Sequence, residues 1–339
     1  MKNFLLFVLV FGLVGYIAYD KLWKEPGAEK KAEGEKQLSK PSAKPAEKDS
    51  AEIGSKIVSS VPDEEEERQA SLDDVMKSMA FPTSSAVNGR SLSDDEISAL
   101  LVEAQKAEEE GRSLDAWSGY TRAHLAGVPE QYEAKLRIKL EAMARAHLAQ
   151  RQAISGLLSI YQVRPGDSLW EIANRWEKDT GIPVAPGFIR YLNDMSSNNI
   201  HEGQKLLVPS SPVRVLCIKS RYRVFLLLGD CYLEEWGVGL GQEGHATPEG
   251  TFSIGSRLER PEFTDRERGV KVPYGEPGNP LGTRWLGFSG SFSSYGIHGT
   301  WEDDSIGENR SKGCLRMKNE DVEELFELLP LKTQVDIEG

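Results

Sequence analysis

The amino-acid sequence predicts a multidomain protein, in which a membrane anchor and a disordered tether precede a small helical module, a βααβ domain and a mostly-β domain. Three observations predict this order. An uncharged apolar run opens the chain, a long polar stretch follows it, and the hydrophobic periodicity then changes from helical to strand-like. With 339 residues the chain is long enough for two or three folded domains. We expect the five parts to span residues 1–23, 24–90, 91–152, 160–210 and 212–339.

The N-terminal run favours a membrane anchor. Residues 4–19 form 16 consecutive positions without a charge, close to the length that spans a bilayer. A cleaved signal peptide is the alternative, but cleavage after Ala18 would place the bulky Tyr16 where a small residue is needed. The sequence therefore predicts an uncleaved anchor over residues 1–23 in the cytoplasmic membrane. The rest of the chain would then lie outside it, in the cell envelope.

The polar composition bears on order and on partners. Residues 24–90 are mostly Lys, Glu, Ala, Pro and Ser, and such a segment cannot bury enough apolar surface to offset the entropy of ordering. We therefore expect a disordered tether. The whole chain has 41 Lys and Arg against 53 Asp and Glu, a net charge of −12. This acidic balance argues against nucleic acid as a general partner, because nucleic-acid binding depends on basic surface.

A helical pattern begins at Ser93, which together with Glu96 has the spacing of a capping box. Apolar residues at helical spacing continue to Gly111, and two further helices are expected over residues 114–125 and 130–148. The small and aromatic positions resemble one tetratricopeptide helix pair: Ala107, Gly111, Ala116, Tyr120 and Ala123. Since such repeats need stacked neighbours, we expect either a helical spacer or a module that binds a protein partner.

The next segment predicts a βααβ domain. Strands over residues 161–163 and 206–209 enclose two helices, the first beginning at Asp167 or Ser168 and the second spanning residues 187–193. The pattern V-x-P-G-D-S-L opens the segment and G-Q-x-L-x-V-P closes it, which resembles the lysin motif, a peptidoglycan-binding module. The resemblance implies a shallow groove for N-acetylglucosamine-containing glycans. Its matching positions here are Gly166, Asp167, Ser168, Asn193, Ile200 and Gly203.

From Val213 onward, short apolar or alternating runs joined by tight turns predict a mostly antiparallel β domain. The turn at residues 229–230 is an example. One helix is expected over residues 319–329, and a last strand over residues 334–337.

Three cysteines lie in this β domain. Cys217 and Cys231 occupy apolar runs, and in a meander they would face roughly Arg223 and Leu228. The two cysteines would then lie several residues apart along the strand between them. Because each residue advances a strand by about 3.3 Å, this separation exceeds the reach of a disulfide. We expect both to be small core residues, which leaves Cys314 as the reactive thiol.

Residues 295–317 carry the chemistry-bearing pair, His298 and Cys314, in a segment rich in glycine and serine. Two strands joined by the polar loop between them could bring the two side chains together. The imidazole would take the thiol proton, and the ion pair would hold the thiolate ready at neutral pH. Backbone N–H groups around Gly313 and Cys314 would stabilise an oxyanion. From the chemistry alone, a coincidental His and Cys is an open alternative.

A metal site is not expected. Zinc needs three or four ligands, and only His245 could join His298 and Cys314. We expect His124 and His147 to be surface or packing residues. The sequence thus predicts neither a metal nor a cofactor.

Several segments together resemble the L,D-transpeptidase catalytic domain: TPEGTF, NPLGTRWLGF, YGIHGT and SKGCLRM, within residues 212–338. In that family H-G is followed, after about fifteen residues, by S-H-G-C. The resemblance implies a β-fold enzyme that attacks the bond between diaminopimelate and D-alanine in a stem peptide and passes the acyl group to an amine or to water. It implies His298 as base and Cys314 as nucleophile. Supporting and substrate-binding positions would be Gly299, Ser311, Lys312, Gly313 and Arg316.

One position departs from the family pattern, since Lys312 stands where the family usually has histidine. A lysine ammonium near Cys314 would itself favour the thiolate, but any role that needs a second imidazole is in doubt. His245 could approach the site, although a loop position near the substrate channel is favoured. Asp303 or Asp304 could orient His298; a solvated loop is the alternative, and a backbone carbonyl could do the same work.

The sequence therefore predicts a membrane-anchored peptidoglycan L,D-transpeptidase of the cell envelope, delivered to its polymer by the lysin motif. Expected partners are peptidoglycan, the membrane and a protein partner of the helical module. An L,D-carboxypeptidase and a transferase that attaches a protein to the wall are alternatives within catalysis. A non-catalytic wall-binding scaffold is the alternative outside it.

Overall fold

The computed structural model describes residues 92–265 and 268–339, which fall within one compact unit of the chain. The predicted anchor and tether lie outside these residues. In the part of the chain that is described, no helix is both long and apolar enough to cross a membrane.

The helical module consists of α3 (Asp94–Glu109), α4 (Ser113–Ala126) and α5 (Glu130–Ala149). Ser93 caps α3, and its side chain and that of Glu96 form the reciprocal bonds of a capping box. All three predicted helices are confirmed. Helices α4 and α5 begin without a side-chain cap, so the apolar spacing was the signal for them.

The βααβ order is also confirmed, with β1 (Leu158–Gln162), α6 (Leu169–Thr180), α7 (Pro186–Leu192) and β2 (Lys205–Pro209). The two strands pair antiparallel, with Leu158 opposite Pro209. Of the two residues predicted to begin the first helix, Ser168 is its N-cap, because its hydroxyl accepts from the backbone N–H of Glu171.

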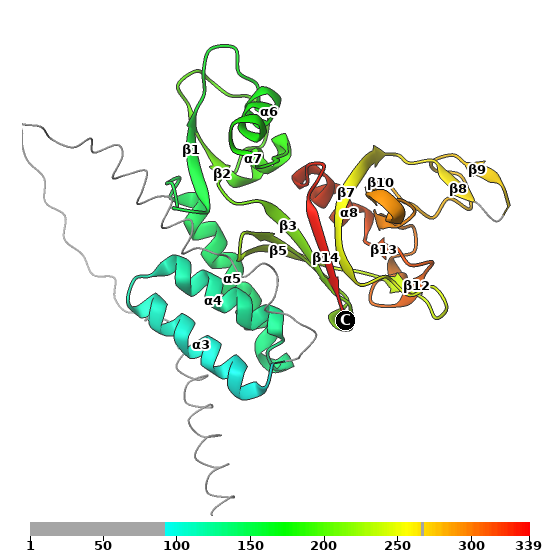
Figure 1. The fold of residues 1–339 in the computed structure, drawn as a ribbon, viewed down its shortest axis with the longest axis horizontal. Coiled ribbons are helices and arrows are strands. Elements are labelled where there is room, and N and C mark those ends of the chain that lie inside the picture. Colours follow the sequence, from blue (N-terminus) through cyan, green and yellow to red (C-terminus); the bar gives the residue numbers. More distant parts are fainter. Residues whose placement is uncertain (1–91, 266–267) are drawn as a thin grey trace, which may run out of the picture. The chain divides into compact units, whose positions relative to one another are not determined.

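An eight-stranded sheet forms the mostly-β domain (Figure 1). Its order is β13 (Leu315–Arg316), β11 (Gly296–His298), β10 (Arg284–Phe288), β7 (Gly250–Glu259), β14 (Gln334–Glu338), β3 (Val213–Ile218), β4 (Arg223–Leu228) and β5 (Cys231–Gly237). Neighbours are antiparallel, except that β14 runs parallel to β3 and β11 parallel to β13. The predicted helix is α8 (Asn319–Leu328). Two small pairs complete the domain: β6 (Leu240–Gly241) with β12 (Asn309–Ser311), and β8 (Phe263–Asp265) with β9 (Val270–Val272).

All three cysteines are free thiols, and Cys217 and Cys231 are buried, as predicted. Cys231 faces Leu228, whereas Cys217 faces Val224, one residue from the expected Arg223. Burial raises the pKa of the Cys217 thiol to about 12 and also raises the pKa of Cys231. Both are therefore protonated core groups at neutral pH.

The helical module covers β5, which is an edge strand of the sheet. The indole Nε1 of Trp117 donates to Tyr232 O at 3.0 Å, and the Tyr232 N–H donates to Thr121 Oγ1 at 3.0 Å. An uncovered edge strand exposes such backbone groups as a template for pairing with another chain. One face of the helical module is therefore occupied by the chain itself, and a protein partner for its remaining surface stays a prediction.

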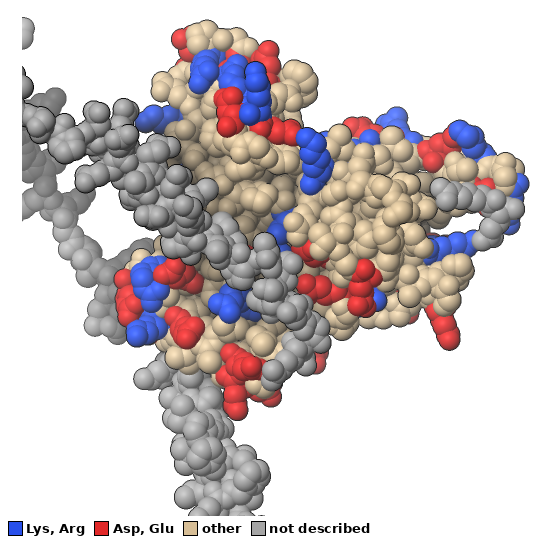
Figure 2. Space-filling model, viewed as in Figure 1, with Lys and Arg blue, Asp and Glu red and all other residues tan. Residues whose placement is uncertain are grey.

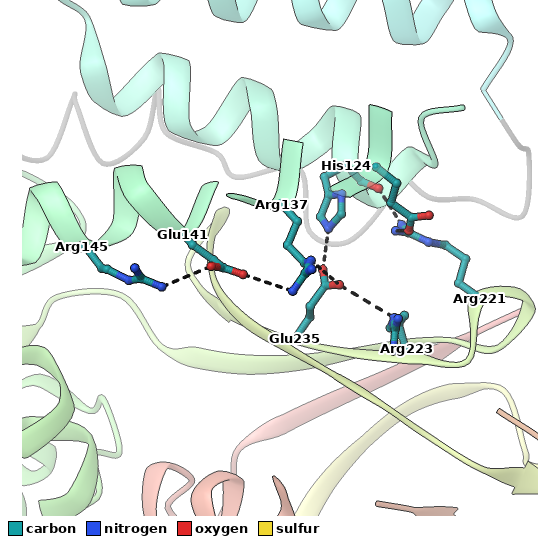
Figure 3. Close-up of polar contacts among 8 residues, drawn as sticks. His124, Arg137, Glu141, Arg145, Arg221, Arg223 and Glu235 are labelled. Atoms are coloured by element: carbon teal, nitrogen blue, oxygen red, sulfur yellow. Dashed lines mark hydrogen bonds and ion pairs between the residues drawn. The ribbon is translucent and has the colours of Figure 1, made fainter. Parts of the chain in front are cut away.

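A buried polar contact extends this interface, as Figure 3 shows. His124 Nε2 lies 2.6 Å from Glu235 Oε2, and Arg137 and Arg223 lie within 3.9 Å of the same carboxylate. Burial alone would raise the pKa of Glu235, but the bond to His124 and the nearby positive charges lower it. Neither His124 nor His147 is a surface residue, because both are buried, and His147 stacks on Trp117.

On the face drawn in Figure 2, Lys and Arg are interspersed with Asp and Glu over the described surface. Several such charges join different elements of the fold, including Lys332 and Glu177 at 2.8 Å. Some of the charged side chains on the described surface therefore form ion pairs between elements that are distant in sequence.

Candidate active site

His298 ends β11, and Cys314 directly precedes the neighbouring β13, at the edge of the sheet opposite to the one covered by the helical module. In the parallel pair of β11 and β13, Ile297 faces Leu315 and His298 faces Arg316. Successive side chains of a strand point to opposite faces. Ile297 and Leu315 are fully buried, so His298 and Arg316 share the other face. Cys314 directly precedes β13, two residues before Arg316, which faces His298.

The imidazole of His298 is held by a backbone carbonyl. Its Nδ1 lies 2.6 Å from Gly299 O, and a carbonyl can only accept, so Nδ1 carries the proton and Nε2 keeps its lone pair. Asp304 does not orient this ring, because its carboxylate pairs with Arg310 at 2.8 Å. Burial lowers the pKa of His298 to about 4, with a further lowering from the charge of Arg316. The imidazole is therefore neutral, and able to accept a proton, at neutral pH.

The thiol of Cys314 is also neutral in this state. Its Sγ lies 3.9 Å from Ser294 O, to which it donates. Burial raises its pKa, while a bond from the Gly296 backbone and the charge of Arg316 act in the opposite direction. The preformed thiolate–imidazolium pair expected from the sequence is therefore not the favoured resting state, because burial disfavours both charges.

We expect the rate of Cys314 alkylation by iodoacetamide to keep rising with pH beyond the ordinary thiol pKa of 9.0, because burial raises the pKa of this thiol. The change Arg316→Gln should slow alkylation at any pH below that pKa, since it removes the positive charge that lowers it. Rates are measured by mass spectrometry of the labelled peptide. Arg310→Gln, which removes an exposed guanidinium paired with Asp304, is the matched control and should change nothing. A plateau around neutral pH would instead indicate a preformed ion pair.

The loop before Cys314 is shaped by Gly313 and Ser311. Gly313 has a φ of +103°, and a Cβ there would lie 2.6 Å from the Tyr295 ring, so both conformation and space require glycine. The hydroxyl of Ser311 accepts from Gly313 N at 3.1 Å and donates to Cys314 O at 2.7 Å. The N–H of Gly313 is therefore already used, which corrects the expectation that it is a free oxyanion donor.

The other supporting positions are placed as follows. Gly299 donates its N–H to Arg284 O at 3.2 Å and orients His298 through its carbonyl, so its contribution is structural. Lys312 is exposed. His245 is also exposed, but its backbone carbonyl would lie 3.5 Å from a Cβ at Gly313, so its turn adjoins the loop of the thiol.

A pocket of about 440 Å³ adjoins this edge, lined by residues 275–280 together with Thr300, Trp301, Glu302 and Arg316. Arg316 Nη1 contacts Glu302 Oε2 at 3.1 Å, while Arg316 Nε is buried and has no hydrogen-bond partner among the described residues. Sequence reasoning missed Trp301, Glu302 and residues 275–280. An aromatic residue directly after the H-G-T segment was the available signal, and Trp301 is indeed 53% exposed.

The structure divides the six expected glycan-binding positions into two kinds. Gly166, Ser168 and Gly203 are exposed, and Ile200 is half-buried. Asp167 and Asn193 instead hold the fold together, which corrects their assignment as glycan contacts.

Asp167 accepts from the Tyr161 hydroxyl at 2.8 Å and from Arg175 at 2.9 Å. The amide of the buried Asn193 donates to Ile189 O at 2.8 Å and to Leu207 O at 2.9 Å, and accepts from Leu207 N at 2.8 Å. These internal bonds use the polar atoms that a sugar would need. The sequence shows that such a residue can form hydrogen bonds, but it does not show whether the partner is a sugar or another part of the chain.

Comparison with known proteins identifies the family. Residues 212–337 match the model of the L,D-transpeptidase catalytic domain, and residues 161–209 match that of the LysM domain. The chain is 40% identical over 131 residues to "Putative L,D-transpeptidase YqjB" of Bacillus subtilis, covering 38% of this chain and 72% of the relative. The chain belongs to the L,D-transpeptidase family.

Another member of the L,D-transpeptidase family, "Putative L,D-transpeptidase YkuD" of Bacillus licheniformis, is 30% identical over 186 residues, or 52% of this chain and 98% of the relative. Among solved structures, L,D-transpeptidase 3 from Mycobacterium tuberculosis with a faropenem-derived adduct is 14% identical. That match covers 54% of this chain and 93% of the other, with a TM-score of 0.33.

Proposed function

We propose that this chain is a peptidoglycan L,D-transpeptidase of cell-wall remodelling, with Cys314 as nucleophile and His298 as base. The observation that carries the proposal is the placement of His298 at the end of β11 and of Cys314 directly before the neighbouring β13, with His298 Nδ1 bonded to Gly299 O. Family membership supports the reaction class, and the LysM match supports peptidoglycan as the polymer.

In the first half of the reaction, Cys314 Sγ attacks the carbonyl carbon of the diaminopimelate residue while His298 Nε2 takes the thiol proton. The tetrahedral intermediate then collapses. The bond to D-alanine breaks, His298 gives the proton to the leaving amine, and a thioester remains on Cys314.

In the second half, an amine of another stem peptide attacks the thioester, and His298 takes a proton from that amine. Cys314 leaves as the thiolate and recovers this proton, so the enzyme returns to its neutral pair. Burial of both groups favours that resting state, because it disfavours the charged forms. Charge then develops only during turnover.

The pocket beside this edge is the proposed place of the stem peptide. The guanidinium of Arg316, which lines this pocket, would donate to a substrate carboxylate, and such charge-assisted bonds are stronger than neutral ones. As to location, we propose the cell envelope, with residues 1–23 in the cytoplasmic membrane and the catalytic part outside it.

The test is incubation of the full chain with disaccharide tetrapeptides, followed by mass spectrometry of the products. We expect cross-linked dimers together with released D-alanine. Trimmed tripeptides without dimers would favour the L,D-carboxypeptidase. No product, together with a Cys314 that a carbapenem leaves unmodified, would favour the wall-binding scaffold.

A further inference from the structure

Helix α8 is attached at its N-terminal end to the loop that follows His298. Its first residue, Asn319, donates through Nδ2 to Thr300 O at 2.8 Å and accepts from Thr283 N at 3.0 Å. Thr300 is two residues beyond His298. The loop of residues 312–314, which carries Cys314 and is called the nucleophile loop below, leads through β13 into α8. The start of α8 is therefore tied to both parts of the proposed active site.

At its other end, α8 contacts α7 of the LysM domain (Figure 1). A Cβ at Gly187 of α7 would lie 2.2 Å from Glu327 O. Gly187 is not among the glycines with positive φ, so space and not backbone conformation requires glycine there. Arg190 of α7 also pairs with Glu327 at 3.0 Å. A partly exposed ion pair contributes little, so the backbone contact at Gly187 is the main determinant of this packing. Two like charges at the same place would instead oppose the packing.

The far end of α7 holds the loop expected to bind glycan. Asn193 is the C-cap of α7, and its buried amide bonds to Ile189 O as well as to the backbone of Leu207 in β2. The loop between Asn193 and β2 contains Ile200 and Gly203. This loop is therefore pinned to α7, just as the nucleophile loop is connected to α8.

We infer that α7 and α8, in contact at Gly187, hold the glycan groove at a set position relative to Cys314. The enzyme would then act on stem peptides at a fixed distance from the sugar that the LysM domain binds. Helix α8, which connects the active site with α7, has 10 residues and is therefore about 15 Å long, at 1.5 Å per residue. This inference rests on the proposed function. It makes Gly187 a positioning residue for polymeric substrate.

The test compares polymer and soluble substrate in the full chain carrying Gly187→Ala. The added methyl must separate α7 from Glu327 O. Because α8 also contacts β10 and β11 of the sheet, we expect α7 to move, which changes the position of the groove and leaves the residues of the active site in place. We expect turnover of intact peptidoglycan to fall by at least about tenfold, since the benefit of a second binding site is lost when geometry forbids simultaneous engagement. Turnover of soluble tetrapeptides and pelleting with insoluble peptidoglycan should not change.

Gly119→Ala is the matched control, because its added Cβ would meet Ala104 within the helical module at 2.9 Å and touches neither α7 nor α8. It should leave the ratio of polymer to soluble turnover unchanged. The inference is overturned if Gly187→Ala also leaves that ratio unchanged, or lowers both rates equally.

A second pair of variants keeps the inference testable if Gly187→Ala does not fold. Glu327→Arg places two cations together at Arg190 and should lower the same ratio, whereas the double change Arg190→Glu with Glu327→Arg should restore it. An unchanged ratio in the single variant overturns the inference. If the wild-type chain is inactive on soluble tetrapeptides, the proposed function fails and the inference with it.

Discussion

Replacing Cys314 by alanine is expected to lower turnover of tetrapeptide substrate by at least about 10⁴-fold, as loss of a covalent nucleophile does in other acyl-transfer enzymes. The physical reason is that no other thiol can substitute. Cys217 and Cys231 are buried, and their pKa values are raised by that burial. The measurement is the rate of D-alanine release from the full chain.

The matched control is Cys217→Ala, which removes a thiol from the core and should retain activity. A carbapenem adduct should form on the wild type and on this control, but not on Cys314→Ala. Residual turnover by Cys314→Ala near the wild-type rate would refute the assignment.

A companion variant, His298→Gln, separates the base from the nucleophile. We expect a loss of about 10²–10⁴-fold in turnover, the usual contribution of a general base. Because the resting thiol does not depend on an imidazolium, alkylation of Cys314 at high pH should survive this change.

Replacing Trp117 by alanine is expected to destabilise the folded chain by about 3–5 kcal/mol, the range observed when a fully buried aromatic residue is truncated. Trp117 has no exposed surface, stacks on His147 and donates to Tyr232 O in the edge strand of the catalytic sheet. Its loss leaves a cavity and an unsatisfied buried carbonyl. The effect should therefore reach β5 as well as the helical module.

Urea unfolding of the full chain, followed by labelling of Cys231, measures this effect, because Cys231 is buried beside Tyr232 in β5. The control is Trp170→Ala, the same substitution at a side chain that is 66% exposed. Its expected effect is within about 0.5 kcal/mol. If Cys231 becomes labelled at the same urea concentration in the Trp117 variant as in the wild type, the helical module does not stabilise the sheet.

Local signals explain why the secondary structure could be predicted. The capping box at Ser93 and the alternating runs from Val213 depend on neighbours in sequence, and the structure has a helix and strands at those places. The His298–Cys314 pair could be singled out for a similar reason, since each of the two residues lies within a short continuous motif, YGIHGT and SKGCLRM.

Partners distant in sequence could not be predicted. Asn193 looked like a glycan contact, yet its amide is consumed by Leu207. His124 is a packing residue, one of the two predicted alternatives, but its partner Glu235, 111 positions away, could not be predicted. No local pattern encodes such contacts, because they depend on how whole elements pack.

The sequence by itself determined the order of the modules, the helices and strands within them, the family and the two residues proposed to be catalytic. Only the tertiary structure decided the charge state of those residues, because pKa values depend on burial and on charges brought close by folding. It also decided what the smaller modules contact: α4 covers the edge strand, and α7 meets α8 at Gly187. Periodicity records which face of an element is apolar, whereas packing selects the surface that it meets.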